Sequence, residues 1–123
     1  MLDHVSIGIT DREKSKAFYD AVLPTIGLMK VADYGEVFAY GPSRENPLFW
    51  LTEQADTGNS QGCHWAFRAP NRAAIHKFHA AALVSGGTDN GGPGKRDYEA
   101  HYYAAFVLDP DGNKIEAVCF DPE

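Results

Sequence analysis

The chain has 123 residues, 44% of them apolar and 12% aromatic, which is enough to bury roughly two-thirds of its unfolded surface in one globular domain. Seventeen acidic and eleven basic residues give a formal net charge of -6, and no run of lysine or arginine favours nucleic acid as a partner. The apolar stretches are far shorter than the ~20 residues that span a bilayer, and the N-terminus lacks a signal pattern. We therefore expect a soluble, unprocessed cytoplasmic protein with no membrane partner.

Both cysteines lie within apolar runs. Cys63 and Cys119 lack the Cys-x-x-Cys spacing of metal sites. This pattern is typical of buried thiols in a reducing compartment, so neither residue is a candidate for chemistry.

The sequence repeats itself at an interval of sixty residues, and six identities occur without a gap. The matched positions are His4 and His64, Arg12 and Arg72, Phe18 and Phe78, Ala21 and Ala81, Leu23 and Leu83, and Gly27 and Gly87. Each half begins with a β-prone segment that is followed by a helix cap and a helical period. The repeat predicts two related modules, 1–60 and 61–123, within a single domain.

The first module reads as a strand, a helix and three strands. Thr10 followed by Glu13 indicates a capping box for the helix, and Gly27 indicates where the helix ends. Short β-prone runs separated by Gly, Pro, Asn and Asp predict the strands, which cover 5–9, 28–33, 37–40 and 48–52.

The second module has the same pattern. Asn71 caps its helix, which Gly86 and Gly87 stop. The predicted strands cover 65–69, 87–90, 102–108 and 114–120, with a glycine-rich binding loop at 90–94 and a turn at 109–113. The fold class is α+β, with two tandem βαβββ modules.

Side-chain alternation selects three residues that face away from the helices. In the strand 5–9, Val5, Ile7 and Ile9 form the apolar face, which leaves His4 on the other. His64 holds the equivalent place in the second module, and Glu116 opposes the apolar residues of the last strand. Two imidazoles and one carboxylate with open positions suit Fe(II), Mn(II), Ni(II) or Zn(II). The alternative is that both histidines are structural and that Glu116 pairs with Lys114.

Further polar residues surround the glycine-rich loop. Tyr98, Glu99, His101, Tyr102 and Tyr103 could line a pocket, and only one of the adjacent tyrosines can point inward. His76 and His79 lie three apart on the second helix without the spacing of a helical metal site, so we assign them to the helix surface or to an interface.

Several motifs resemble the vicinal oxygen chelate superfamily, which includes glyoxalase I, bleomycin resistance proteins, fosfomycin-modifying thiol transferases and extradiol dioxygenases. The motifs are 3–7 (DHVSI), 15–19 (SKAFY), 63–67 (CHWAF) and 109–116 (DPDGNKIE), and the likeness covers almost the whole chain. The resemblance implies an incompletely closed eight-stranded barrel with helices outside, which holds a divalent metal and chelates adjacent substrate oxygens.

The resemblance also assigns site residues. His4, His64 and Glu116 match three metal positions, and Glu116 would also be catalytic. Trp50 occupies the fourth position, a glutamate in glyoxalase I, and cannot bind metal. Glu53 and Glu99 are the nearest carboxylates, but neither has the right context. The expected substrate-binding residues are Trp50, Arg68, Tyr98, His101, Tyr102 and Tyr103.

Three functions follow from this resemblance. The first is a metal-dependent isomerase or lyase, thiol transferase or dioxygenase that acts on a small oxygen-rich substrate. The second is a metal-free binding protein of the bleomycin resistance type, for which acidic charge and aromatic residues suit a cationic antibiotic. The third is a scaffold that keeps the metal without turnover.

Short relatives are usually homodimers whose sites combine the first module of one chain with the second of the other, and we expect a homodimer here.

Overall fold

The computed structural model describes residues 1–58 and 62–122 and contains the strand-helix-strand pattern twice. The first module consists of β1 Val5–Ile9, α1 Arg12–Val22, the short 3-10 helix η1 Leu23–Ile26, β2 Met29–Asp33, β3 Val37–Gly41 and β4 Phe49–Glu53. The second consists of β5 His64–Arg68, α2 Arg72–Val84, β6 Thr88–Asp89, β7 Gly94–Lys95, β8 Tyr103–Leu108 and β9 Lys114–Cys119. The predicted boundary between residues 60 and 61 lies outside the described residues.

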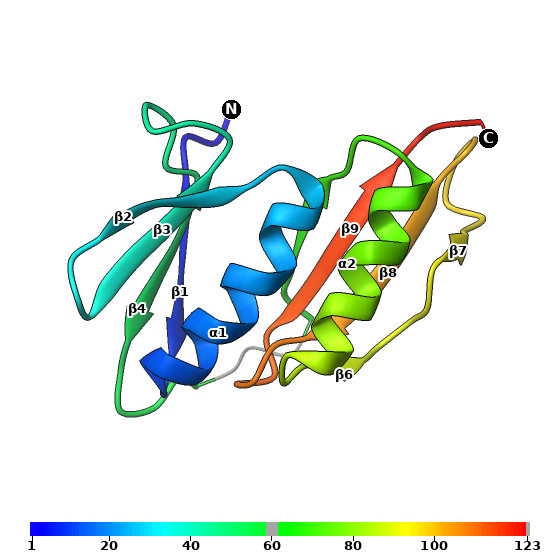
Figure 1. Cartoon of the computed structure of the whole chain (residues 1–123). Coiled ribbons are helices and arrows are strands. Elements are labelled where there is room, and N and C mark those ends of the chain that lie inside the picture. Colours follow the sequence, from blue (N-terminus) through cyan, green and yellow to red (C-terminus); the bar gives the residue numbers. More distant parts are fainter. Residues whose placement is uncertain (59–61, 123) are drawn as a thin grey trace.

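Each module forms its own sheet, and the two sheets lie side by side (Figure 1). The strand order is β1-β4-β3-β2 in the first sheet and β5-β9-β8-β6 in the second, where β7 also pairs with β8. The first strand of each module runs parallel to the last, β1 with β4 and β5 with β9. The predicted α+β fold of two βαβββ modules is confirmed, with sheets that do not close on each other.

The core lies between the helices and one face of the sheets. Figure 1 shows α1 and α2 side by side in front of the strands. Ile9, Phe67 and Ile115 from the strands are buried in one cluster with Phe18 and Phe78 from the helices. The alternation predicted from the sequence is therefore correct, and the opposite sheet faces remain for other contacts.

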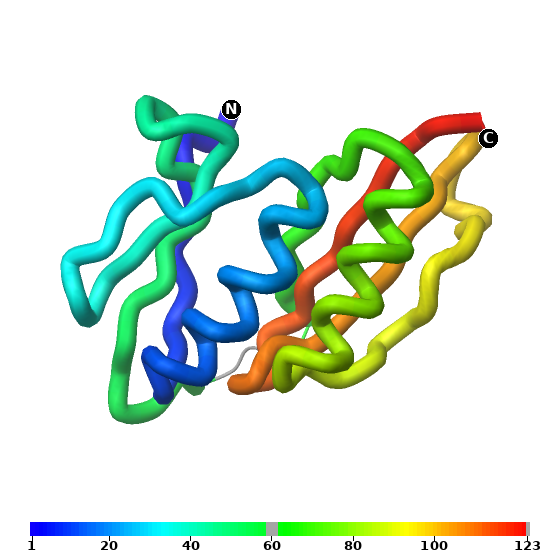
Figure 2. The backbone as a smooth tube through the Cα atoms, in the orientation of Figure 1, coloured from blue at the N-terminus to red at the C-terminus, as the bar shows by residue number. Residues whose placement is uncertain are grey.

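Equivalent arginines begin the two helices and make equivalent contacts. The guanidinium of Arg12 lies 5.4 Å from the centre of the Phe38 ring, and that of Arg72 lies 4.5 Å from the centre of the Tyr103 ring. Both termini lie at one end of the molecule, as expected for two copies of one path (Figure 2). The internal repeat is thus a structural repeat.

The turn between β8 and β9 fastens the second module to the first. The buried Tyr19 hydroxyl of α1 donates to Asp109 over 2.7 Å, and the Asn113 amide donates to the carbonyl of Gly8 over 3.2 Å. Burial raises the pKa of Tyr19 well above its ordinary value, so this hydroxyl remains a donor. These bonds fix where β1 lies relative to β9.

Three local predictions were wrong. Asp11, and not Thr10, caps α1 by accepting from the backbone N–H of Lys14 over 3.1 Å, so the predicted capping box does not form. The Thr10 hydroxyl donates instead to Asp111 of the β8–β9 turn, a long-range partner that local spacing does not reveal. The α-helix ends at Val22, before η1 leads to Gly27. Cys63 is exposed because it precedes β5, whereas Cys119 is buried as expected.

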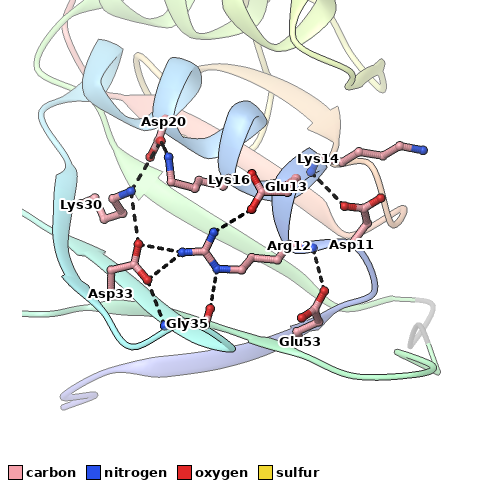
Figure 3. A network of polar contacts seen from close by, with 10 residues as sticks. All are labelled: Asp11, Arg12, Glu13, Lys14, Lys16, Asp20, Lys30, Asp33, Gly35 and Glu53. Atoms are coloured by element: carbon pink, nitrogen blue, oxygen red, sulfur yellow. Dashed lines mark hydrogen bonds and ion pairs between the residues drawn. The ribbon is translucent and has the colours of Figure 1, made fainter.

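A network of charged residues ties α1 to the β2–β3 hairpin (Figure 3). Arg12 donates to both carboxylate oxygens of Asp33 over 2.7 Å, and the Lys30 ammonium lies between Asp33 and Asp20. The hydrogen bonds from Arg12 hold the pKa of Asp33 at about 2.

No helix among the described residues is long and apolar enough to cross a membrane.

Candidate functional site

His64 and Glu116 meet on the sheet face that points away from the helices. They come from the parallel neighbours β5 and β9, in which His64 pairs with Lys114 and Ala66 pairs with Glu116. The His64 Nε2 atom lies 2.9 Å from Glu116 Oε1. The Glu116 side chain is 1% exposed, whereas that of His64 is 41% exposed. A buried carboxylate thus stands behind an imidazole that solvent can reach.

Tyr102 completes the surroundings of this carboxylate by donating its hydroxyl proton to Glu116 Oε2. Burial and this hydrogen bond raise the pKa of Tyr102 well above its ordinary value. Tyr98 packs edge-on against the Tyr102 ring with 5.0 Å between ring centres. Tyr103 instead faces α2, where its hydroxyl lies 2.7 Å from His76 Nε2. Tyr102 is therefore the inward member of the adjacent tyrosine pair.

The pocket in front of the His64–Glu116 pair contains residues that sequence reasoning missed. Its lining residues are His64, Asn90, Arg96, Tyr98, Tyr102, Phe106, Lys114 and Glu116. Phe106 pairs in register with Glu116, so alternation could have found it, whereas Lys114 was already placed on the face of Glu116. Arg96 follows the glycine-rich loop, an irregular segment in which no side-chain alternation predicts where the residue points. The alternative ion pair between Glu116 and Lys114 is not formed, since the Lys114 ammonium lies over the Phe106 ring.

His4 and Trp50 lie in the first module, apart from this pocket. His4 immediately precedes β1, is 54% exposed, and has its Nδ1 atom 2.6 Å from the Asp3 carboxylate. Its ring centre lies 6.4 Å from that of Trp50, which stacks on Tyr34 at 6.5 Å. Within 1–58 and 62–122 of one chain, no three His, Cys, Asp or Glu residues gather as a metal site. A single chain brings together His64 and Glu116, and not His4.

Two other predicted substrate-binding residues line neighbouring hollows. Arg68 lies at the far end of β5, with its guanidinium 4.7 Å from the centre of the Phe120 ring. His101 is exposed, has a positive φ of 60°, and shares a hollow with Arg96, Glu99 and Tyr102. Neither residue is among those that line the pocket in front of the His64–Glu116 pair.

The remaining candidates have structural partners. Glu53 accepts a hydrogen bond over 3.0 Å from the backbone N–H of Arg12 at the start of α1, which explains its place on the opposite face from Trp50. His79 lies 2.9 Å from Asp89, and His76 contacts Tyr103. His76 is exposed on α2, the His79 side chain is 15% exposed, and neither lines the pocket in front of His64 and Glu116.

The donor atoms of His64 and Glu116 fit part of a divalent metal site. His64 Nε2 and Glu116 Oε1 lie 2.9 Å apart, and both residues line the same pocket. One imidazole nitrogen and one carboxylate oxygen suit borderline divalent metals, and the Tyr102 hydroxyl is the outer partner that such carboxylates usually have. Within the residues that the structure describes, no third His, Cys, Asp or Glu of the same chain joins this pair.

Comparisons with known proteins agree with this fold. A family model described as the Glyoxalase/Bleomycin resistance protein/Dioxygenase superfamily matches residues 1–117. A solved glyoxalase/bleomycin resistance protein from Albidiferax ferrireducens is 36% identical, with a TM-score of 0.83, over 96% of this chain and 97% of its own. No curated protein matches.

More distant structures share the fold alone. A fosfomycin resistance protein from Mesorhizobium loti is 13% identical over 96% of this chain and 90% of its own, with a TM-score of 0.69. A glyoxalase I mutant from Zea mays is 18% identical over 95% of this chain and 46% of its own, with a TM-score of 0.73. With the match over residues 1–117, the chain belongs to the glyoxalase/bleomycin resistance protein/dioxygenase superfamily.

Proposed function

We propose that the protein is a divalent-metal-dependent enzyme that acts on a small, oxygen-rich molecule in the cytoplasm. The observation that carries this proposal is the buried Glu116 carboxylate, 2.9 Å from His64 Nε2 at the back of a pocket. This carboxylate and the imidazole offer one oxygen and one nitrogen to the pocket that they line. Zinc, nickel, iron or manganese would suit these donors.

The residues of this chain have two roles: some hold the metal-binding side chains in place, and others form the wall of the pocket. Tyr102 holds Glu116 Oε2 by its O–H, which leaves Oε1 as the atom that points to His64. His64 would bind metal through Nε2 as the tautomer with its proton on Nδ1. Phe106 and Tyr102 give the pocket an aromatic wall. A bound divalent metal supplies Lewis acidity that polarises a carbonyl, enolate or catecholate oxygen.

We propose that the third ligand is His4 from a second copy of the chain in a homodimer. His4 repeats His64 in sequence but lies at the first sheet, outside the pocket of its own chain. Trp50 and Tyr34 form a stacked pair beside it, and they would supply an apolar wall opposite Glu116. Homodimers with twofold symmetry make two such composite sites at once.

Metal analysis of the purified protein tests the proposal. We expect about one divalent metal per chain, and we expect Glu116→Gln or His64→Ala to weaken its binding by more than about 100-fold, the upper range for outer partners. His79→Ala is the matched control, because this histidine of α2 contacts Asp89 of β6 and does not line the pocket. Unchanged metal binding in Glu116→Gln and His64→Ala would contradict the proposal.

A second candidate is a binding protein that holds a small molecule without catalysis. The stacked Tyr34 and Trp50 rings favour it, because they offer an aromatic ligand a flat surface at the first sheet. It predicts a protein that stays folded and binds its ligand after metal has been removed. Metal content together with turnover separates the two candidates.

A further inference from the structure

We propose that the pocket at His64 and Glu116 takes an organic acid, and that Arg96 and Lys114 bind its carboxylate, phosphate or phosphonate group. This inference rests on the proposed function, because it names the class of substrate for the same site. The aromatic ring of Phe106 is the reference point, since both cations and His64 surround it.

The geometry around Phe106 brings the charges close together. The Lys114 ammonium lies 4.8 Å and the Arg96 guanidinium 5.4 Å from the centre of this ring. The ring centre of His64 lies 6.0 Å away. A small molecule over Phe106 can therefore reach both cations while an oxygen at its other end reaches the His64–Glu116 pair.

Arg96 is held in place by backbone carbonyls and not by a carboxylate. Its guanidinium donates to the carbonyls of Gly92 and Gly94 over 2.9 Å each, and more weakly to that of Lys95 over 3.4 Å. These bonds fix the direction of the planar group and leave its full positive charge. A guanidinium that is fixed in this way loses little entropy when it binds an oxyanion.

Lys114 is the second cation of the pocket, and its ammonium group lies over the Phe106 ring. Its side chain is half-buried on β9, two residues before Glu116 and on the same face. Within the part of the chain that the structure describes, neither Lys114 nor Arg96 forms an ion pair, although the exposed Asp97 and Glu99 are close to Arg96 in sequence.

The local charge is opposite to that of the whole molecule. The chain carries a net charge of -6, which suggested a cationic ligand from composition. In the pocket, however, the carboxylate of Glu116 is already engaged by His64 and Tyr102, while neither cation forms an ion pair with any residue that the structure describes. Because Coulomb interactions between groups a few ångströms apart outweigh those with distant surface charges, the pocket should select anions.

The test is a titration of the metal-free, full-length protein, followed by the backbone amide signals in NMR spectra. Acetate and inorganic phosphate serve as separate probes, which distinguishes a carboxylate site from a phosphate or phosphonate site. We expect at least one probe to shift the amides of Gly91, Arg96 and Phe106 in a saturable way. Tetramethylammonium, the cationic probe, should leave these signals unchanged.

Variants assign the binding to the two cations. Arg96→Gln and Lys114→Gln should each weaken binding of the anion about tenfold, the loss expected for one charge-assisted hydrogen bond. Arg96→Lys keeps the charge but loses the bonds that fix the planar group, so its affinity should lie between that of the wild type and that of Arg96→Gln. Lys14→Gln, which removes an equal charge from the exposed surface of α1, is the matched control and should have no effect.

The outcomes separate this proposal from the proposed function. If neither anion binds, or if Arg96→Gln and Lys114→Gln bind as well as the wild type, the substrate class is wrong. Tetramethylammonium binding at these amides would also overturn it. Metal binding by Arg96→Gln and Lys114→Gln should remain at the wild-type level in every case. If the wild-type protein binds the anion but no divalent metal, only the proposal of a metal-dependent enzyme is wrong.

Discussion

His64 and Glu116 are joined diagonally across the parallel strands β5 and β9, with Nε2 of the imidazole 2.9 Å from Oε1 of the carboxylate. The residue directly opposite Glu116 is Ala66, whose single methyl group leaves room for the imidazole. The histidine of the second repeat, at the start of β5, thus contacts a buried carboxylate on the neighbouring strand.

Tyr102 should control how well this pair binds metal. Tyr102→Phe removes the hydroxyl that donates to Glu116 Oε2, and keeps the ring that packs against Tyr98 and Phe120. Loss of such an outer partner weakens metal binding by about 10- to 100-fold. Competition with a fluorescent chelator measures the change. Tyr98→Phe is the control, and equal affinities for the two variants would show that the hydroxyl of Tyr102 does not support the site.

Arg12 should determine the acidity of Asp33 in the network of Figure 3. The Arg12 hydrogen bonds lower the pKa of Asp33 to about 2, so Arg12→Gln should raise it toward the ordinary value of about 3.9. Carboxyl signals in NMR spectra follow the titration. Asp89, whose pKa is lowered by its bond to His79, serves as an internal control in the same spectra and should not move.

The sign of the effect on stability follows from the same shift. A carboxylate whose pKa is lower in the folded chain stabilises the fold above its unfolded pKa, near 3.9, and loses this contribution as pH falls toward 2. In Arg12→Gln, the free energy of unfolding should therefore depend less on pH between about 4 and 2. Denaturation curves at several acidic pH values check this, and an unchanged slope would contradict it.

Tyr19 should stabilise the contact between the modules. Tyr19→Phe leaves the buried Asp109 without the hydroxyl that donates to it over 2.7 Å. Asp109 Oδ2 keeps the Asn113 amide as a donor at 2.9 Å, so the loss is that of one buried hydrogen bond, about 0.5–1.5 kcal/mol of unfolding free energy. Urea denaturation measures the loss. Tyr34→Phe, at an exposed position, is the control and should change the stability by less than about 0.5 kcal/mol.

The sequence predicts what depends on local periodicity. Alternation places His64 and Glu116 on one face, and the sixty-residue repeat gives both modules, because strands obey a period of two whatever surrounds them. The partner of Thr10 and the orientation of Arg96 could not be predicted in this way, for a physical reason. The partner of Thr10 is the distant Asp111, and the direction of Arg96 is set by carbonyls of an irregular loop.

The place of His4 depends on quaternary structure, which side-chain alternation within one chain cannot specify. If each site combines His4 of one copy with His64 and Glu116 of the other, the protein sediments as a dimer. His4→Ala and Glu116→Gln should then each lose metal binding as homodimers. A mixed dimer of the two variants behaves differently, because it contains one site with all three ligands and one site that lacks two of them.

Subunit exchange between these variants is therefore the decisive measurement. When equal amounts are dissociated together and reassociated at random, half of the dimers are mixed, and each recovers one site out of two. Metal binding should return to about a quarter of the wild-type content per chain. The control is a mixture of His64→Ala with Glu116→Gln, two ligands that lie on the same chain, in which every site is damaged and nothing returns. Equal recovery in both mixtures, or none in the first, would contradict a site shared between subunits.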